Sequence, residues 1–485
     1  MIMMIQHMYM YIFLAMLLIG LLLYVLLDKD HQTIHKKYRV YFKLKSGRLK
    51  IDNVKRGVSI IGSAGSGKTE SVVYNLLQHF SKQQFCGIIH DYKDFELTEI
   101  AYPLFRKNTE IKFYTISFDT IYYKVNPIAP RYLPNEESVN ELSRVLIENL
   151  LEQGESMNAT TRFFNDAVEG LLAGLIWKLK TDYPKFCTLP HLIAIFQSMD
   201  TKKLVAFLSS NLTSKSMSSA FINGIESEKQ TAGVKSTLAN AFKKISSQKL
   251  FMVLSEDEVP LNINHEENPS IISIINNPKY ESAYAPIIAT IMHTVIKQMS
   301  VRNQKSSFVL MEEAPTIKLL NMHRIPATLR SYDIATVYVM QDKIQNDMLY
   351  GDKASKAILS NLSYQFFGKV NDPDTAKYYE QFFELIKVPT RSVSRSSGLT
   401  LESRITKGEK EVSKRRASIF FTLKQGEFVA FADGKDRKVK FKLQRIEKHI
   451  PDSNSKYSEE KLILNYDSIY REIGLLFSKK QIPQK

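Results

Sequence analysis

A glycine-rich stretch with the pattern G-x-x-x-x-G-K-[ST] constrains the fold of this chain more than any other feature. Its residues are Gly62, Ser63, Ala64, Gly65, Ser66, Gly67, Lys68 and Thr69. The apolar run 58–61 precedes it, and a segment with helical apolar spacing follows it. In such a loop, glycines turn backbone N–H groups toward a phosphate, the lysine reaches the β and γ oxygens, and the hydroxyl binds Mg²⁺. The stretch therefore predicts a phosphate-binding loop between a strand and a helix.

The helix expected to begin at Thr69 would add its partial positive charge to the same site. We expect residues 62–70, Glu70 included, to contact the nucleotide, with Thr69 on the metal. A glycine turn without a ligand is the alternative interpretation.

The chain is basic, which bears on its partners. It holds 66 Lys and Arg against 50 Asp and Glu, a formal charge of +16. Such an excess suits a polyanion, either nucleic acid or anionic lipid, or serves solubility alone. Cys86 and Cys187 stand in apolar surroundings and form no C-x-x-C pair, so we expect neither a disulfide framework nor a zinc site.

Residues 8–27 form an uncharged apolar run that is long enough, at ~1.5 Å per residue, to cross a ~30 Å hydrocarbon core. We expect one transmembrane helix here, within a membrane anchor of residues 1–36; a cleaved signal peptide is the alternative. Lys and Arg follow the run and do not precede it. The positive-inside rule then places the amino terminus outside and the bulk of the chain in the cytoplasm.

Strand-like and helical segments alternate in residues 37–134 and 255–450. This alternation predicts a nucleotide-binding domain of the α/β class, with a mostly parallel sheet and helices on both faces. Residues 135–254 show almost only helical periodicity, which predicts an inserted all-α domain.

The carboxyl-terminal part of the chain is less regular. Residues 391–416 are rich in Ser, Lys and Arg and are expected to form a mobile loop, either touching an anion or simply solvated. Residues 419–423 are expected to form a strand, and residues 451–485 a polar tail.

The apolar run 308–311 ends on two acids, Glu312 and Glu313. A strand of this kind delivers side chains to the carboxyl edge of the sheet, where the phosphate loop also lies. We expect Glu312 to bind Mg²⁺, directly or through water, and Glu313 to polarise the attacking water. A pair of acids at a strand end is also common on protein surfaces.

Three further polar residues are candidates for the same site. Gln341 ends the next apolar run and is a candidate γ-phosphate sensor, with a strand cap as the alternative. Arg330 is a candidate arginine finger for a neighbouring subunit's nucleotide, or a surface ion-pair residue. Asp91 follows the apolar run 86–89 and either joins the site or caps the turn after it.

Six segments, in this order, resemble landmarks of the type IV secretion system coupling proteins, the TraG/TraD family of conjugation ATPases. They are GSAGSGKTES, IIHDYKDFE, TTRFFNDAVEGLLAGLIW, FVLMEEAP, ATLRSYDIATVYVMQDKIQ and GKVNDPDTAKYYEQFF. The resemblance spans about residues 57–443. It implies a membrane-anchored, RecA-like P-loop NTPase with an inserted all-α domain, which assembles as a hexamer.

The resemblance also implies roles for single residues. Lys68 and Thr69 would be the Walker A residues, Glu313 the catalytic glutamate, Arg330 the finger and Gln341 the sensor. The family's Walker B motif usually reads Asp-Glu, whereas Glu312 replaces the Asp here, and its longer side chain shifts the metal contact. The family's D-P-K-G-E motif is Asp-Tyr-Lys-Asp-Phe-Glu in this chain, and one membrane helix is visible where members commonly carry two.

The expected function is an ATPase of the bacterial inner membrane that uses ATP and Mg²⁺. By the resemblance, it would recruit relaxase-bound single-stranded DNA, or protein substrates, through relaxosome proteins and deliver them to a type IV secretion channel. One alternative is a double-stranded DNA translocase of the FtsK/HerA kind. Another is a membrane docking scaffold that uses ATP only to assemble.

Overall fold

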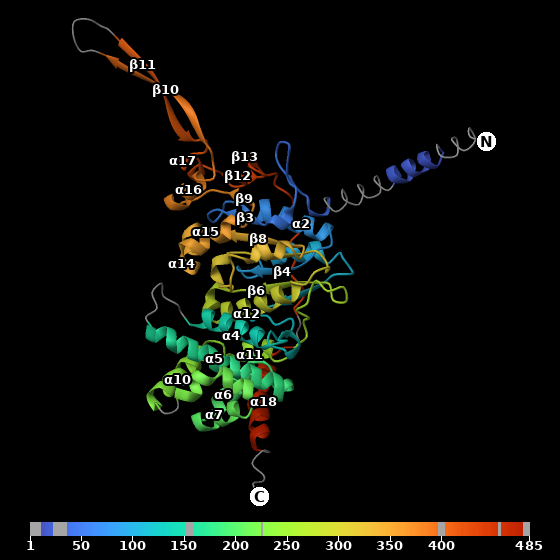
Figure 1. Cartoon of the computed structure of the whole chain (residues 1–485), viewed down its shortest axis with the longest axis vertical. Coiled ribbons are helices and arrows are strands. Elements are labelled where there is room, and N and C mark those ends of the chain that lie inside the picture. The colour runs from blue at the N-terminus through green and yellow to red at the C-terminus, as the bar shows by residue number, and fades with distance from the viewer. Residues whose placement is uncertain are drawn as a thin grey trace.

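The computed structural model describes residues 11–22, 36–151, 159–224, 227–395, 403–453 and 457–478. Its body is a mostly parallel sheet with helices on both faces (Figure 1). A region of helices lies at one end of the body, and a long two-stranded ribbon projects from the other. The α/β class expected from the alternation of strands and helices is confirmed.

The strands that build the fold are β1 (Val40–Lys43), β2 (Arg48–Ile51), β3 (Val58–Ile61), β4 (Cys86–Asp91), β5 (Lys112–Ile116), β6 (Ser270–Ile275), β7 (Ser307–Met311), β8 (Ile334–Met340), β9 (Tyr364–Phe367), β10 (Leu385–Arg395), β11 (Ser403–Ser413), β12 (Glu427–Ala432) and β13 (Lys435–Lys440). The large sheet has the order β13-β12-β9-β3-β8-β7-β4-β6-β5. The pairs from β9 to β5 are parallel, and β12 and β13 add an antiparallel edge.

Apolar side chains cover both faces of this sheet. Successive residues of a strand point to opposite faces, so Ile60 belongs to one buried cluster and Ile61 to the other. The same split separates Ile88 from Ile89. Strands that are buried on both faces are typical of a parallel sheet covered by helices.

The larger helices are α2 (Tyr74–Lys82), α3 (Thr98–Phe105), α4 (Glu136–Leu150), α5 (Ala159–Asp182), α6 (Leu189–Ser198), α7 (Thr201–Ser209), α10 (Glu228–Lys244), α11 (Gln248–Leu254), α12 (Glu281–Met299), α13 (Ile325–Arg330), α14 (Lys343–Tyr350), α15 (Asp352–Ser360), α16 (Pro373–Glu380) and α18 (Glu459–Ser478). Three shorter helices are α8 (Leu212–Met217), α9 (Ser219–Asn223) and α17 (Ser418–Phe421).

Between β5 and β6, the described chain forms helices α4 to α11 and no strand. The first of them, α4, begins at a capping box in which Asn135 Oδ1 accepts a hydrogen bond from Ser138 N over 3.1 Å. Helix α4 packs against α12, one of the helices that cover the sheet. Helix α5 packs against α4, α8, α9 and α10. The helical periodicity of this stretch is therefore realised as helices that lie against one another.

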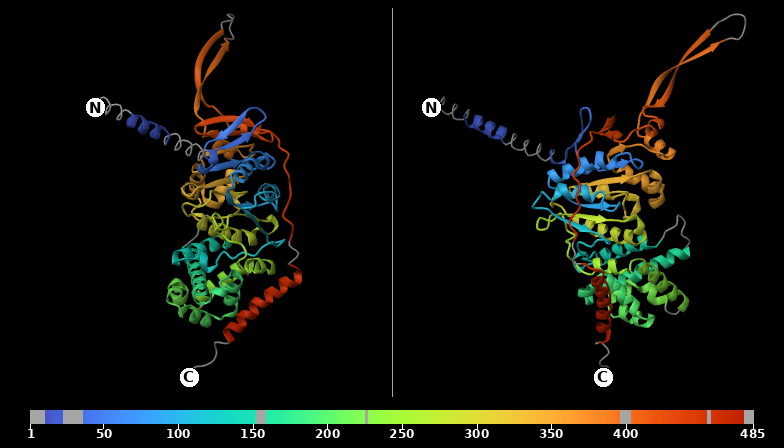
Figure 2. Two further views of the ribbon diagram at one scale, coloured as in Figure 1. Left: turned by 90° about the vertical axis from the view of Figure 1, so that its right-hand side faces the viewer. Right: turned by 180° about the vertical axis from the view of Figure 1, so that it is seen from behind.

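The prediction of a polar tail at residues 451–485 is wrong for most of that segment, because Glu459–Ser478 form helix α18. An extended segment leads to it from β13 along the side of the body (Figure 2). The backbone of that segment is held where His449 N donates to Glu99 O over 2.8 Å. Helix α18 then packs on α6 and α11 and buries Leu462, Ile469 and Ile473. Helix α18 therefore packs through three widely spaced apolar residues, and the remaining residues make the segment polar overall.

Two other expectations for the carboxyl-terminal part are also wrong. Within residues 391–416, residues 391–395 end strand β10 and residues 403–413 form strand β11 instead of a loop, with Arg391 opposite Lys407 and Arg395 opposite Ser403. Residues 396–402 lie outside the described residues. Residues 419–423 form the end of the short helix α17 and a turn instead of a strand. In both places the backbone is set by contacts that local composition does not reveal.

Part of the expected transmembrane helix, residues 11–22, forms a helix with exposed side chains. The rest of the expected span, residues 8–10 and 23–27, lies outside the described residues. Within the described ranges, no helix has the length and apolar character required to cross a membrane.

The packing of α18 can be tested by cavity formation. Ile469→Ala removes buried methyl groups and should lower the free energy of unfolding by about 2–4 kcal/mol, seen as a lower urea midpoint. Leu464→Ala on the exposed face of the same helix should change it by no more than about 0.5 kcal/mol. Equal effects of the two substitutions would contradict this packing.

Candidate active site

The phosphate loop leaves the carboxyl end of β3, between β8 and β9. Gly62 N donates to Met340 O over 3.2 Å, and Ser63 N donates to Lys369 O over 2.7 Å, so both neighbouring strands hold the loop. Gly65 and Gly67 have φ of +73° and +87°, a left-handed conformation that favours glycine. A π-helical turn, Thr69–Val73, follows and continues into α2. The predicted strand, loop and helix are therefore confirmed.

Lys68 is folded back onto its own loop. Its Nζ donates to Gly62 O over 2.5 Å and lies 3.4 Å from Ser63 O. Burial lowers the pKa of Lys68, and the nearby charge of Glu313 opposes that shift. The ammonium group is thus satisfied by backbone carbonyls that a phosphate would have to replace.

A second segment supports the loop from outside. Gly426 N donates to Ser66 O over 2.9 Å, and a Cβ atom on Gly67 would come within 3.0 Å of Gly426 N. The contact joins the loop to the turn before β12, more than 350 residues away in the sequence. The sequence pattern does not predict a role for Gly426. Of the remaining loop positions, Ala64 and Glu70 are exposed, and Thr69 is half-buried.

Glu312 and Glu313 follow β7, two strands away from β3, at the same edge of the sheet. Both side chains are buried, 3% and 2% exposed. Glu312 Oε2 accepts a hydrogen bond from Tyr92 N over 3.3 Å. Glu313 Oε1 accepts one from Gln341 Nε2 over 3.0 Å, which places the expected sensor residue beside the expected catalytic acid.

Two features mark Glu313 as unusual. Its φ is +43°, a left-handed conformation that costs a non-glycine residue free energy and is often kept at functional sites. Its Oε2 atom is buried without a hydrogen-bond partner among the described residues. An unpaired buried carboxylate oxygen at this edge fits a site that takes up a water molecule or a metal-bound ligand.

Lys93 is a member of the cluster that sequence reasoning missed. Its Nζ lies 3.6 Å from Glu312 Oε1 and 3.2 Å from Glu313 Oε1. Burial alone would lower the pKa of Lys93, but the charges of Glu312 and Glu313 raise it. Lys93 follows β4 in the segment whose family counterpart also carries a lysine, and that was the available signal.

The electrostatics of the two acids differ. Burial, together with the charge of Asp91, raises the pKa of Glu312 to about 8. Asp91 Oδ2 accepts hydrogen bonds from Thr98 N over 2.7 Å and from Thr98 Oγ1 over 2.6 Å. Asp91, the last residue of β4, thus caps the start of α3 instead of the turn after β4, and its charge also acts on Glu312.

The site offers few protein ligands for a metal. Among the described residues, no group of three or more His, Cys, Asp and Glu side chains could hold an ion. Mg²⁺ is commonly bound through one or two protein ligands together with phosphate oxygens and water. A hydroxyl from Thr69 and a carboxylate from Glu312 fit that donor set.

Arg330 is not part of this cluster. It is exposed at the end of α13, four residues before β8 begins, whereas Gln341 directly follows β8. A strand of seven residues at ~3.3 Å per residue separates the two edges of the sheet by about 23 Å. Arg330 therefore lies at the edge opposite the phosphate loop of its own chain.

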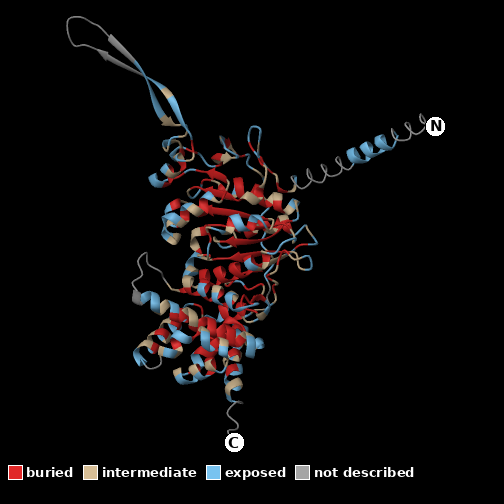
Figure 3. Cartoon of the chain, viewed as in Figure 1, coloured by how far each residue is buried: buried red, intermediate tan, exposed pale blue. Residues whose placement is uncertain are grey.

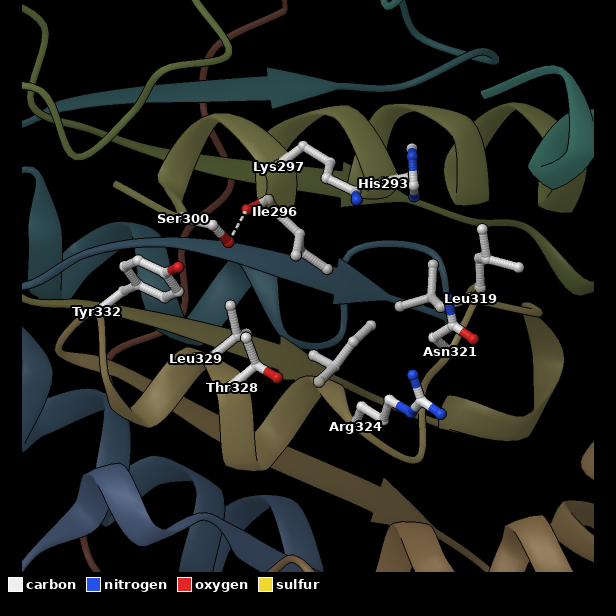
Figure 4. Close-up of a pocket in the computed structure, with 12 residues that line it drawn as sticks. His293, Ile296, Lys297, Ser300, Leu319, Asn321, Arg324, Thr328, Leu329 and Tyr332 are labelled. Atoms are coloured by element: carbon white, nitrogen blue, oxygen red, sulfur yellow. Dashed lines mark hydrogen bonds between the residues drawn. The ribbon is translucent and has the colours of Figure 1, made fainter. Parts of the chain in front are cut away.

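A hollow of about 320 Å³ lies beside the helix that carries Arg330 (Figure 4). Arg324, which precedes α13, and Leu329 of α13 line one side of it, and His293 and Lys297 of α12 line the other. Figure 4 shows these side chains between the two helices. The hollow does not include the phosphate loop, Glu312 or Glu313.

Comparison with known proteins identifies one family. A family model described as "Type IV secretory system Conjugative DNA transfer" matches residues 24–417. No individually curated protein sequence shows a significant match.

Solved structures of the bacterial conjugative coupling protein TrwB share the fold. An unbound form of TrwBdeltaN70 superposes with a TM-score of 0.65 at 13% identity, covering 84% of this chain and 90% of that one. TrwB with the ATP analogue ADPNP gives a TM-score of 0.63 at 13% identity, covering 82% and 87%. TrwB with ADP and Mg²⁺ gives 0.63 at 13% identity, covering 81% and 86%. At such low identity these likenesses establish the fold alone.

The buried carboxyl of Glu312 predicts a pH effect on stability. Its pKa rises from 4.5 to about 8 on folding, so between these values the folded chain holds a proton that the unfolded chain has lost. The free energy of unfolding therefore falls as the pH rises through this window, and this decrease is complete above about pH 8. Glu312→Gln removes this titration, so its Tm relative to wild type should rise between pH 5 and pH 8.5.

The exposed Glu110→Gln is the control and should keep one offset from wild type at both pH values. A constant offset for Glu312→Gln would show that the carboxyl keeps the same protonation state in the folded and unfolded chain.

Proposed function

The chain belongs to the type IV secretory system conjugative DNA transfer family, and we propose that it is a membrane-anchored coupling ATPase. In this proposal it recruits relaxase-bound single-stranded DNA, or protein substrates, and delivers them to a type IV secretion channel. The observation that carries the proposal is the hydrogen bond between Gln341 and Glu313, next to the phosphate loop. It pairs a buried acid with an amide at the strand edge where phosphoryl transfer in this fold takes place.

The proposed nucleotide is ATP with Mg²⁺, supported by the nucleotide complexes of TrwB. Residues 62–70 would bind the phosphates through backbone N–H groups, and Lys68 would exchange its loop carbonyls for phosphate oxygens. Thr69 and Glu312 would hold Mg²⁺, which neutralises negative charge on the phosphates.

Glu313 is the proposed base that orients the attacking water. Its lone Oε2 is available for that contact, while Gln341 fixes Oε1. Gln341 would then report the presence of the γ-phosphate through the same bond. Lys93 lies beside both acids, and its positive charge offsets the cost of burying negative charge there.

Arg330 is the proposed arginine finger, acting on a neighbouring subunit. Its position about 23 Å from the loop of its own chain, the length of seven strand residues, favours a contact in trans. Such a role requires a ring in which the amino edge of one subunit faces the carboxyl edge of the next. We therefore propose a homo-hexamer, with α4 to α11 recognising the substrate or relaxosome proteins.

The proposed location is the bacterial inner membrane, with the apolar residues 8–27 as a single-pass anchor and the bulk of the chain in the cytoplasm. In this proposal the excess of Lys and Arg over Asp and Glu binds DNA phosphates, so the affinity for DNA would fall as the salt concentration rises.

The catalytic assignment predicts two different failures. Lys68→Ala should abolish ATP hydrolysis and DNA transfer and leave membrane insertion intact, because the phosphate contact is lost. Glu313→Gln should lower kcat by about 10²–10⁴-fold while nucleotide binding persists, because only the base is lost. The measurement is phosphate release by the full chain in detergent, with and without single-stranded DNA, and Lys202→Ala as the exposed control.

An active Lys68→Ala protein would overturn the site assignment. Wild-type hydrolysis that single-stranded DNA does not stimulate would favour the docking scaffold over the motor.

The finger assignment predicts complementation. Arg330→Ala should be inactive alone and partly active when mixed with Lys68→Ala, because a mixed ring contains sites with an intact loop and an intact finger. Arg302→Ala is the matched control. Arg302 is also exposed and precedes β7, the neighbour of β8 in the sheet, at the same edge as Arg330. Full activity of Arg330→Ala, or no recovery in mixtures, would point to a structural role for Arg330.

A further inference from the structure

The β10–β11 ribbon projects from the body of the protein (Figure 1). Eleven pairs run from Leu385 opposite Ser413 to Arg395 opposite Ser403. At ~3.4 Å per residue, the ribbon extends about 35 Å from the body. It projects away from the sheet in every view (Figures 1 and 2), and its described side chains are mostly exposed (Figure 3).

The charges on the ribbon change along its length. Near the body, Lys387 stands opposite Glu411 and lies 3.8 Å from Glu409, so positive and negative charges balance. Farther out, residues 390–395 and 403–408 contain no Asp or Glu. They carry four cations: Arg391, Arg395, Arg404 and Lys407.

Folding alone does not account for this distal charge. Arg391 stands directly opposite Lys407, and like charges at opposed positions destabilise a strand pair. A two-stranded ribbon without a covering layer is already marginal in water. A bound polyanion would turn the repulsion into attraction, which identifies the kind of partner that the distal ribbon fits.

The other residues of the ribbon favour nucleic acid over a membrane. Thr390, Ser392, Ser394 and Thr406 alternate with the cations, and hydroxyl groups of this kind donate hydrogen bonds to phosphate oxygens. The sequences of residues 385–395 and 403–413 contain no aromatic residue. They therefore offer neither the aromatic anchors of a membrane interface nor a platform for stacking bases.

We propose that the distal β10–β11 ribbon binds the sugar-phosphate backbone of the transported DNA without reading its sequence. This inference rests on the proposed function, because it names the element that holds that substrate. The ribbon lies at the opposite end of the body from α4 to α11 (Figure 1), so DNA and protein components would be held at separate ends.

The test neutralises the four distal cations in the full chain in detergent, as R391Q, R395Q, R404Q and K407Q together. Binding of a fluorescent oligo-dT strand is measured at several salt concentrations. The affinity should fall at least tenfold at low salt, and the slope of log K against log salt should fall by about 3, at ~0.7 per lost phosphate contact. DNA-independent ATP hydrolysis should be unchanged.

Two further variants separate charge from structure. Lys82, Lys112, Lys279 and Lys353 are exposed and lie outside both the ribbon and α4 to α11, and changing these four to Gln removes the same charge. That variant should keep the wild-type slope. R391K, R395K and R404K together keep the ribbon's charge and should retain binding. A ribbon variant that binds like wild type overturns the inference, whereas a wild type that binds no DNA overturns the proposed function.

Crosslinking identifies what touches the ribbon. Both native cysteines, Cys86 and Cys187, are buried, so a benzophenone label on Ser394→Cys is selective. In proteoliposomes containing phosphatidylglycerol and supplied with oligo-dT, the label should crosslink to DNA. Crosslinking to lipid or to a neighbouring subunit, with none to DNA, would contradict the inference.

Discussion

The parallel pairing of β9, β3, β8, β7 and β4 is the constraint on which the rest of the structure depends. Parallel strands end at one edge, so residues far apart in the sequence meet without any local signal that they are neighbours. The phosphate loop follows β3, Gln341 follows β8, and Glu312 and Glu313 follow β7. The intervening helices serve mainly to cover the two faces and to fix this strand order.

Bringing two acids into a buried edge has an electrostatic cost that the neighbouring residues offset. Lys93 lies within 3.6 Å of both carboxylates, Tyr92 N binds one of them and Gln341 the other. Even so, burial holds the pKa of Glu312 well above its ordinary value. Lys68 is likewise satisfied only by carbonyls of its own loop. The charged groups of the site are therefore paired with one another or with the loop backbone, and a charged ligand can replace these contacts.

The sequence predicted where the residues that follow strands lie, because the carboxyl ends of parallel strands meet at one edge of the sheet. Lys93 was missed because it stands at the start of a turn in which Asp94 and Phe95 have positive φ, and no periodicity describes such a turn. Gly426 was missed because it contacts Ser66, which is far away in the sequence, and no local pattern predicts such a contact. The ribbon and α18 were missed because few of their described side chains are buried, so their packing depends on the neighbouring segment and not on local composition.

Hydrogen–deuterium exchange of the full chain, with and without ATP and Mg²⁺, tests the central claim that these separate segments form one nucleotide site. The account predicts simultaneous protection at residues 62–74, 91–97, 311–317 and 340–343, which follow four different strands. Protection confined to residues 62–74, or spread equally over the hollow beside α13, would contradict it.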